Sequence, residues 1–271
     1  MSAVTVRDRF WIWGHEAGSH DHGGGLRWTS RMTPAEGAFY LGVPNLIMVR
    51  YRDRSGTPLP LPPYDQYALA FRPLRRVVWS CVHEAGVTEP EEVERVVDLA
   101  RSNPNLCGAM MDDFFYDAND KRGPETAVHT ADELRGLRER LRSAERPLDL
   151  WVVLYQHQLQ RPVREHLAQC DVVNFWTWNA RDLAAQEESF GRLEELAPGS
   201  RKVLGCYLWD YGDRQPMPVD LMEQQCVRGL EWLRQDRIEG IVFLASCICD
   251  MGLPAVEWTR QWIAEVGDMQ L

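Results

Sequence analysis

The sequence lacks the features that would bring a protein to a membrane or to a nucleic acid. It has no apolar run long enough to span a bilayer. Its first residues, MSAVTVRDRFWIWG, do not follow the charged-then-apolar order of a secretory signal peptide. Acidic residues outnumber basic ones by 40 to 30, which gives a net charge of −10. Since nucleic acids and anionic lipids both need a basic surface, we expect neither as a partner.

A pattern of paired cysteines is also missing. The seven cysteines lie at irregular positions, several of them inside apolar runs: Cys81, Cys107, Cys170, Cys206, Cys226, Cys247 and Cys249. This set favours reduced, buried thiols over a disulfide framework. Cys247 and Cys249 are close together, but no second pair follows at zinc-finger spacing, so we interpret them as structural. With no signal peptide, these thiols predict a cytoplasmic protein.

The sequence does contain a regular alternation of short apolar runs and amphipathic stretches. Eight runs rich in Val, Ile, Leu and aromatic residues are typical of strands buried on both faces. They are Phe10–Trp13, Asn45–Arg50, Arg76–Val82, Leu106–Met111, Leu148–Tyr155, Asp171–Trp176, Arg201–Leu208 and Glu239–Leu244. Helix start signals lie between them, such as Thr33 before Pro34 and Thr130 three residues before Glu133.

Strands that alternate with helices predict a parallel sheet built of right-handed βαβ units. Eight units in a chain of 271 residues predict a single α/β domain over residues 1–271, a (β/α)8 TIM barrel. No G-x-G-x-x-G motif follows the first strand, which disfavours an open dinucleotide-binding sheet. The longest connection follows strand two, at residues 51–73, and we expect it to hold one short helix and to form a wall or lid over the site.

Polar, ionisable and aromatic residues collect directly after the predicted strands. The carboxyl ends of the strands carry the active site in such barrels, and five of the seven histidines fall in these segments. His15 and Glu16 follow strand one, Arg50 ends strand two, and His83 and Glu84 follow strand three. Asp112 and Asp113 follow strand four, Tyr155 and His157 lie at the end of strand five, and Asn174, Trp176 and Trp178 lie at the end of strand six. Trp209, Asp210 and Tyr211 follow strand seven, and Trp28 lies in the first loop. The opposite strand ends carry nothing comparable, which indicates an enzyme.

The tetrapeptide HEAG occurs after strand one and again after strand three. We interpret each copy as a His–Glu pair at a strand tip followed by a turn of small residues. Because strand residues alternate in direction, at most one side chain of each pair points straight into the barrel mouth. Each glutamate is equally well explained as a partner of loop amides or of an arginine.

The segments GAMMDDFFYD and YLWDYG resemble strand ends of the broad group of (β/α)8 glycoside hydrolases. The resemblance is one of pattern over the barrel architecture, and the Asn-Glu strand-four signature of a large retaining clan is absent. It implies that Asp210 and one of Asp112 and Asp113 flank a glycosidic bond. We favour Asp112 as the residue facing the mouth. Glu16 and Glu84 are further candidate acids. Substrate binding would fall to His15, His83, Trp28, Arg50, Tyr155, His157, Asn174, Trp176, Trp178, Trp209 and Tyr211.

Two other interpretations stay open. Histidines and carboxylates at strand ends also suit a divalent metal in a barrel isomerase, aldolase or hydrolase acting on a sugar or small acid. Neither lysine of the chain, Lys121 or Lys202, follows a strand, so Schiff-base chemistry is disfavoured. A non-catalytic sugar-binding barrel is the third interpretation. The many aromatic residues at the strand ends favour a carbohydrate hydrolase that needs no cofactor or metal and acts on a small glycoside.

Overall fold

A computed structural model describes residues 3–20, 25–26, 28–52, 58–82, 90–117 and 126–271. The chain divides into two compact units. The first unit comprises Met1–Met48, Thr177–Ala184 and Lys202–Leu271, and the second comprises Val49–Trp176 and Ala185–Arg201.

The predicted fold class is confirmed. Eight parallel strands form a closed barrel in the order β1-β12-β9-β8-β7-β6-β5-β2. Each of the eight predicted strands is present, and the observed bounds differ from the predicted ones by at most two residues at either end. Neighbouring strands in the barrel are also neighbours among the predicted strands along the chain, as the βαβ rule requires.

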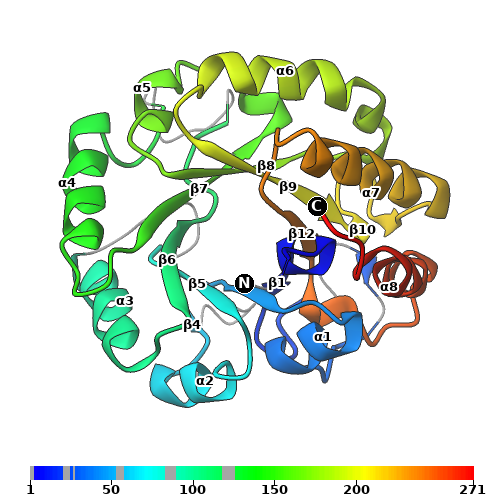
Figure 1. The fold of residues 1–271 in the computed structure, drawn as a ribbon, viewed down its shortest axis with the longest axis horizontal. Helices are drawn as coiled ribbons and strands as arrows, with labels where there is room; N and C mark the ends of the chain where they lie inside the picture. The colour runs from blue at the N-terminus through cyan, green and yellow to red at the C-terminus, as the bar shows by residue number, and fades with distance from the viewer. Residues whose placement is uncertain (1–2, 21–24, 27, 53–57, 83–89, 118–125) are drawn as a thin grey trace. The chain divides into compact units, whose positions relative to one another are not determined.

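The first unit contains four of the barrel strands in the order β2-β1-β12-β9. These strands are β1 (Phe10–Gly14), β2 (Asn45–Met48), β9 (Arg201–Tyr207) and β12 (Ile241–Leu244). Its α-helices are α1 (Pro34–Leu41), α7 (Val219–Arg234) and α8 (Pro254–Val266), and α7 packs against α8 (Figure 1). Short elements complete it: η1 (Val6–Arg9), η5 (Ala180–Ala185), η6 (Ser246–Ile248) and a hairpin of β10 (Trp209–Asp210) and β11 (Gln215–Pro216).

The second unit contains the other four barrel strands in the order β5-β6-β7-β8. They are β5 (Arg76–Ser80), β6 (Leu106–Met111), β7 (Asp149–Tyr155) and β8 (Val172–Trp176). The helices are α2 (Tyr64–Ala70), α3 (Pro90–Ser102), α4 (Ala131–Arg142), α5 (Arg164–Leu167) and α6 (Gln186–Leu196), with the 3-10 turn η4 (Gln156–Gln158). Helices α3 and α4 lie side by side along the outer side of β6 and β7 (Figure 1).

The helix start signals in the sequence act as predicted. The Thr33 side chain accepts a hydrogen bond from the backbone N–H of Glu36, and the Glu36 carboxylate accepts one from the Thr33 N–H. Thr130 and Glu133 form the same reciprocal capping box at the start of α4. Each box satisfies two backbone donors that a helix start otherwise leaves without partners.

Ring contacts establish which side chains of the second unit face the helices. Trp79 of β5 packs on Tyr64 and Phe71, with ring centroids 6.1 and 5.9 Å apart. Trp79 is in register with Ala109 of β6, so Gly108 and Met110 face the opposite side, the barrel interior. A Cβ atom on Gly108 would lie 2.9 Å from the indole nitrogen of Trp151. The interior is therefore crowded at this level, and glycine makes room for the tryptophan.

The connection after β2 holds the expected short helix, α2. It also contains a two-stranded hairpin of β3 (Tyr51–Arg52) and β4 (Pro58–Leu59), which the sequence analysis did not predict. Its role as a wall or lid stays a prediction. Across the described ranges, no helix is both long and apolar enough to cross a bilayer.

Candidate functional site

The acidic pair after β6 is the first group of candidate residues. Strand β6 ends at Met111, and its alternation places Asp112 on the interior side with Gly108 and Met110. Asp113 then adopts a positive φ of 48°, a conformation that Asp tolerates better than most residues. Its backbone N–H donates to Oδ1 of Asp112 at 3.0 Å. The two neighbouring carboxylates therefore lie in different environments: Asp112 is half-buried and Asp113 is exposed.

The environment of Asp112 favours its protonated form. Burial raises the pKa of this carboxyl well above its ordinary value of 3.8, and the negative charge of Asp113 raises it further. These two effects outweigh the hydrogen bond from the Asp113 N–H, which favours the carboxylate. A carboxylic acid whose pKa is raised by its surroundings is the kind of group that a general acid requires.

This raised pKa makes stability depend on pH. Between pH 3.8 and the raised pKa, the folded protein holds a proton on Asp112 that the unfolded chain releases. The free energy of unfolding therefore falls as pH rises through this window. We expect Asp112→Asn to be more stable than the wild type at pH 7 and to lose that advantage near pH 3.8. Urea unfolding of both proteins at several pH values checks this, and equal pH slopes would contradict it.

Tyr155 and His157 lie beside the acidic pair at the end of β7. The Tyr155 hydroxyl donates to Oδ1 of Asp113 at 2.8 Å. The rings of Tyr155 and His157 stack with centroids 5.4 Å apart and planes 7° apart. His157 Nε2 lies 2.8 Å from Oδ1 of Asp117, which also accepts a hydrogen bond from the Gln158 amide at 3.1 Å. The second unit thus brings four residues predicted from the sequence, Asp112, Asp113, Tyr155 and His157, together at the ends of β6 and β7.

Asn174 and Trp176 of β8 are the deepest candidates in the second unit. Phe175 packs on Phe190 of α6, so its neighbours along the strand face the interior. Trp176 is buried and offers no exposed face to a sugar. Asn174 has no solvent exposure, and neither atom of its side-chain amide has a hydrogen-bond partner among the residues the structure describes. A buried amide in this state costs stability.

We expect Asn174→Val to raise the free energy of unfolding by about 1–2 kcal/mol, because it removes two polar atoms that protein groups do not satisfy. Val also suits an interior strand position. Chemical denaturation measures the change, and Val173→Ala, at a buried position beside it, is a control expected to destabilise. A loss of stability in Asn174→Val would mean that an internal water completes the amide's hydrogen bonds.

Arg50 lies within a network of buried contacts. Its guanidinium forms a buried ion pair with Glu92 of α3, donates to the Tyr64 hydroxyl at 3.3 Å, and lies 5.5 Å from the centroid of that ring. Arg50 is 4% exposed, so its guanidinium is enclosed by these contacts. Arg95 binds the same Glu92 carboxylate at 2.6 Å. Arg50 thus anchors the segment after β2 to α3, and the substrate-binding role that its position after a strand suggested stays a prediction.

In the first unit, the HEAG segment after β1 forms the expected turn. The Ser19 N–H donates to the Glu16 carbonyl at 3.1 Å, and Gly18 has a φ of +86°, which only glycine adopts without strain. The turn folds the chain back, so that the rings of His15 and His20 lie 4.5 Å apart. Burial lowers the pKa of His15 well below 6.5, with the neighbouring His20 as a second cause, and burial lowers the pKa of His20 to about 4. Both imidazoles are therefore neutral at pH 7.

Asp210 is fully buried and serves the loop that follows β9. Its Oδ1 accepts from the backbone N–H groups of Asp213 at 3.2 Å and Ala180 at 3.4 Å, and its Oδ2 accepts from the Gln215 amide at 3.4 Å. The sequence predicts a part in the chemistry for this carboxylate, and that role stays a prediction. In the structure its hydrogen bonds hold the turn between β10 and β11.

An aromatic cluster lies beside His20. The hydroxyl of Tyr211 and Nδ1 of His20 form a hydrogen bond of 2.9 Å. Tyr207 lies edge-on to Tyr211 at 5.3 Å, and Trp178 contacts both tyrosines at 5.8 and 6.0 Å. Burial raises the pKa of Tyr211 well above its usual value of 10. Trp178 is 38% exposed.

Two predicted aromatic residues line one cavity of the first unit. This cavity of about 440 Å³ is lined by Leu26, Trp28 and Trp209 and by the segments Arg214–Pro216 and Met251–Pro254. Trp28 is 62% exposed, whereas Trp209 is nearly buried and contributes part of the cavity wall. All of these segments follow the carboxyl ends of β1, β9 or β12.

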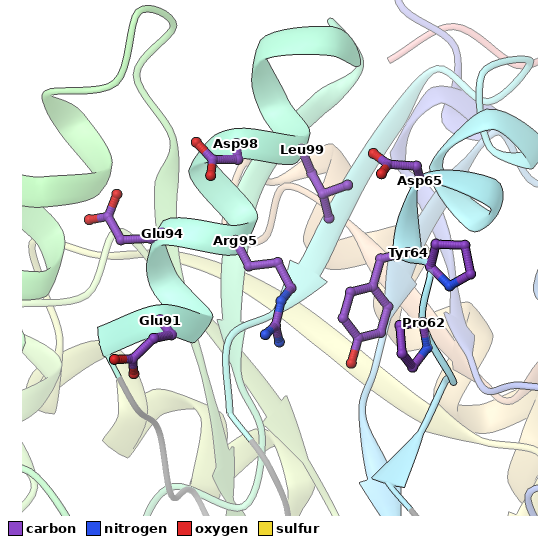
Figure 2. Close-up of a pocket in the computed structure, with 9 residues that line it drawn as sticks. Pro62, Tyr64, Asp65, Glu91, Glu94, Arg95, Asp98 and Leu99 are labelled. Atoms are coloured by element: carbon purple, nitrogen blue, oxygen red, sulfur yellow. The ribbon is translucent and has the colours of Figure 1, made fainter.

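A second cavity of about 650 Å³ lies in the second unit between α2 and α3. Figure 2 shows Arg95 and Leu99 extending from α3 toward Tyr64, with Glu94 and Asp98 extending to the other side. Three of the charged side chains that line it form ion pairs: Arg95 with Glu92, Glu94 with Arg140, and Asp98 with Arg101. Because its walls are helix faces outside the strand ends, we assign this cavity no part in the candidate site.

His83 and Glu84, the second HEAG pair, lie outside the described residues, as do Asp21 and His22. Glu16 is half-buried at the first turn, where its carbonyl closes the turn. Tyr207, Ser19 and Ser246 have no role predicted from the sequence. Ser246 Oγ accepts from the His15 N–H at 3.0 Å and donates to the His15 carbonyl at 3.1 Å, which ties η6 to the end of β1. The position of Ser246, two residues after the predicted strand Glu239–Leu244, was the signal that could have identified it.

No family model and no curated protein matches the sequence. Solved structures share the fold. A putative alpha-L-fucosidase from Bacteroides thetaiotaomicron superposes with a TM-score of 0.60 at 12% identity, covering 100% of this chain and 99% of that one. YKL-39, solved in the presence of chitooligosaccharides, gives 0.58 at 11% identity, covering 93% and 98%. The PgaB (BpsB) glycoside hydrolase domain from Bordetella bronchiseptica gives 0.53 at 11%, covering 88% and 92%.

Proposed function

We propose that the chain is a carbohydrate-active hydrolase that cleaves the glycosidic bond of a small glycoside or oligosaccharide. The observation that carries the proposal is the Asp112–Asp113 pair at the end of β6. One member has its pKa raised by burial, and the other is exposed and held by the Tyr155 hydroxyl. Glycoside hydrolysis uses two such carboxyl groups, one that donates a proton and one that is ionised.

In this proposal Asp112 is the general acid that protonates the leaving-group oxygen. Asp113 is the ionised partner, and the Tyr155 hydroxyl fixes its orientation at 2.8 Å. His157 stacks on Tyr155 and limits the movement of the phenol. Asp210, whose two oxygens accept hydrogen bonds from its own loop, positions the segment that carries Tyr211.

The aromatic residues of the first unit support a carbohydrate as the ligand. Trp28 and Trp209 border a cavity of about 440 Å³, a size in the usual range for small-molecule sites. Trp178 adds a partly exposed ring. Flat apolar faces beside polar groups suit pyranose rings, which have apolar C–H faces and hydroxyl edges. The names of the similar structures, a fucosidase and a protein solved with chitooligosaccharides, suggest the first substrates to try.

The test is hydrolysis of a panel of aryl glycosides and chitooligosaccharides by the intact protein, with and without a chelator. We expect turnover that the chelator leaves unchanged, because no step of the proposal needs a metal or another cofactor. We expect Asp112→Asn and Asp113→Asn each to lower it strongly. Unchanged activity in both variants would show the assignment to be wrong. Sugar affinity without any turnover, measured by calorimetry, would instead support a binding protein.

A further inference from the structure

Three side chains of the first unit place nitrogen and sulfur donors together beside the aromatic cluster. His15 and His20 come from the HEAG turn, and Cys247 comes from η6 after β12. One potential ligand atom of each residue lies within 4.8 Å of the other two. Cys247 is fully buried, His15 is 7% exposed and His20 is half-buried. The group is a cluster of metal-ligand residues from segments more than two hundred residues apart in sequence.

We propose that His15, His20 and Cys247 bind one Zn²⁺ ion. Two imidazoles and a thiolate form a donor set that suits zinc, whereas Mg²⁺ and Ca²⁺ prefer oxygen ligands. In a tetrahedral zinc site the donor atoms would lie about 3.3–3.7 Å from one another, given the usual zinc–nitrogen and zinc–sulfur distances. Small side-chain rotations bring donors that are within 4.8 Å of one another to that spacing. Three protein ligands leave a fourth position for water, as in catalytic zinc sites.

The surrounding contacts hold the donors in place. Nδ1 of His20 forms a 2.9 Å hydrogen bond with the Tyr211 hydroxyl, which leaves Nε2 as the nitrogen that faces a metal. Such an outer hydrogen bond is the usual support of a metal-binding histidine. Ser246 fixes the backbone of His15 through two hydrogen bonds and immediately precedes Cys247.

Cys249, only two residues away, behaves as an ordinary buried thiol. Its Sγ donates to the Ala245 carbonyl at 3.4 Å, and the sulfur of Cys170 makes the same kind of bond to the His166 carbonyl at 3.5 Å. Cys247 instead faces two imidazoles. The contrast gives a matched control on the same short turn, because Cys249→Ser changes the same kind of atom in equally buried surroundings.

The experiment measures metal in the intact protein, purified without chelator, by inductively coupled plasma mass spectrometry. Co²⁺ is then titrated into the demetallated protein, because a cobalt–thiolate bond gives a charge-transfer absorption band in the near ultraviolet. We expect one equivalent of zinc and a band that saturates at one equivalent of cobalt. Cys247→Ser should abolish the band, and His20→Asn should weaken binding by more than about 100-fold, since even outer-shell losses cost 10–100-fold.

Cys249→Ser and His157→Asn are the controls, and both should retain the metal and the band. The proposal is overturned if the wild-type protein gives no charge-transfer band at stoichiometric cobalt, or if Cys247→Ser binds cobalt with wild-type affinity and spectrum. If Cys247→Ser does not fold, the wild-type spectrum decides, because the band itself reports a sulfur ligand. None of these readouts depends on glycoside hydrolysis.

Discussion

Asp112→Asn should lower the hydrolysis of glycosides with poor leaving groups by about 10²–10⁴-fold, the usual contribution of a positioned general acid. An alkoxide leaving group needs a proton from a general acid, and burial together with the Asp113 charge raises the pKa of Asp112. An activated phenolate such as dinitrophenolate leaves without that proton. The same variant should therefore lose far less activity on dinitrophenyl glycosides.

The measurement compares kcat/KM of the wild type and Asp112→Asn across aryl glycosides of increasing leaving-group pKa. If kcat/KM falls steeply with increasing leaving-group pKa for Asp112→Asn but not for the wild type, the result supports the general-acid role of Asp112. Asp113→Asn is the matched control, because Asn also tolerates the positive φ of this position. It should lower activity on all leaving groups alike. A uniform loss in Asp112→Asn would contradict the role assigned to it.

Arg50→Met should lower the free energy of unfolding by about 3 kcal/mol, near the low end of the cost of breaking a buried ion pair. The substitution leaves the buried Glu92 carboxylate with Arg95 as its remaining charged partner. It also removes the guanidinium from the Tyr64 ring. The effect is large because Met fills the space without neutralising the carboxylate.

A double-mutant cycle separates the ion pair from the packing. Arg50→Met combined with Glu92→Leu should recover most of the stability, because apolar replacement of both partners of a buried pair is often neutral. Urea unfolding supplies the four free energies. If Arg50→Met unfolds like the wild type and instead raises KM, then Arg50 binds substrate, as the sequence analysis expected, and the anchoring role is wrong.

The barrel could be predicted from the sequence because its strands are buried on both faces. Runs such as Leu106–Met111 are apolar at every position, and the capping boxes at Thr33 and Thr130 depend on neighbours three residues away. These signals are local, so a single sequence contains them. The β3–β4 hairpin carries only two residues per strand, too few for any periodic pattern.

The candidate site could be predicted only as a set of residues at strand ends. Asp210 and Asp112 both follow a strand, yet backbone N–H groups bind the carboxylate of Asp210, whereas burial raises the pKa of Asp112. That difference depends on loop conformations and on partners such as Ala180, thirty residues away. The proximity of Cys247 to His15 and His20 likewise arises from strand pairing between β1 and β12, which no local spacing reveals.

Hydrolysis in ¹⁸O-labelled water, followed by mass spectrometry of the products, tests the central claim most directly. If the chain hydrolyses a glycosidic bond with Asp112 as general acid, the intact protein will release sugars that carry one ¹⁸O atom at the new reducing end. Asp112→Asn will form that product far more slowly from oligosaccharides with unactivated leaving groups. Products without the label, or labelled products formed equally fast by Asp112→Asn, would contradict the claim.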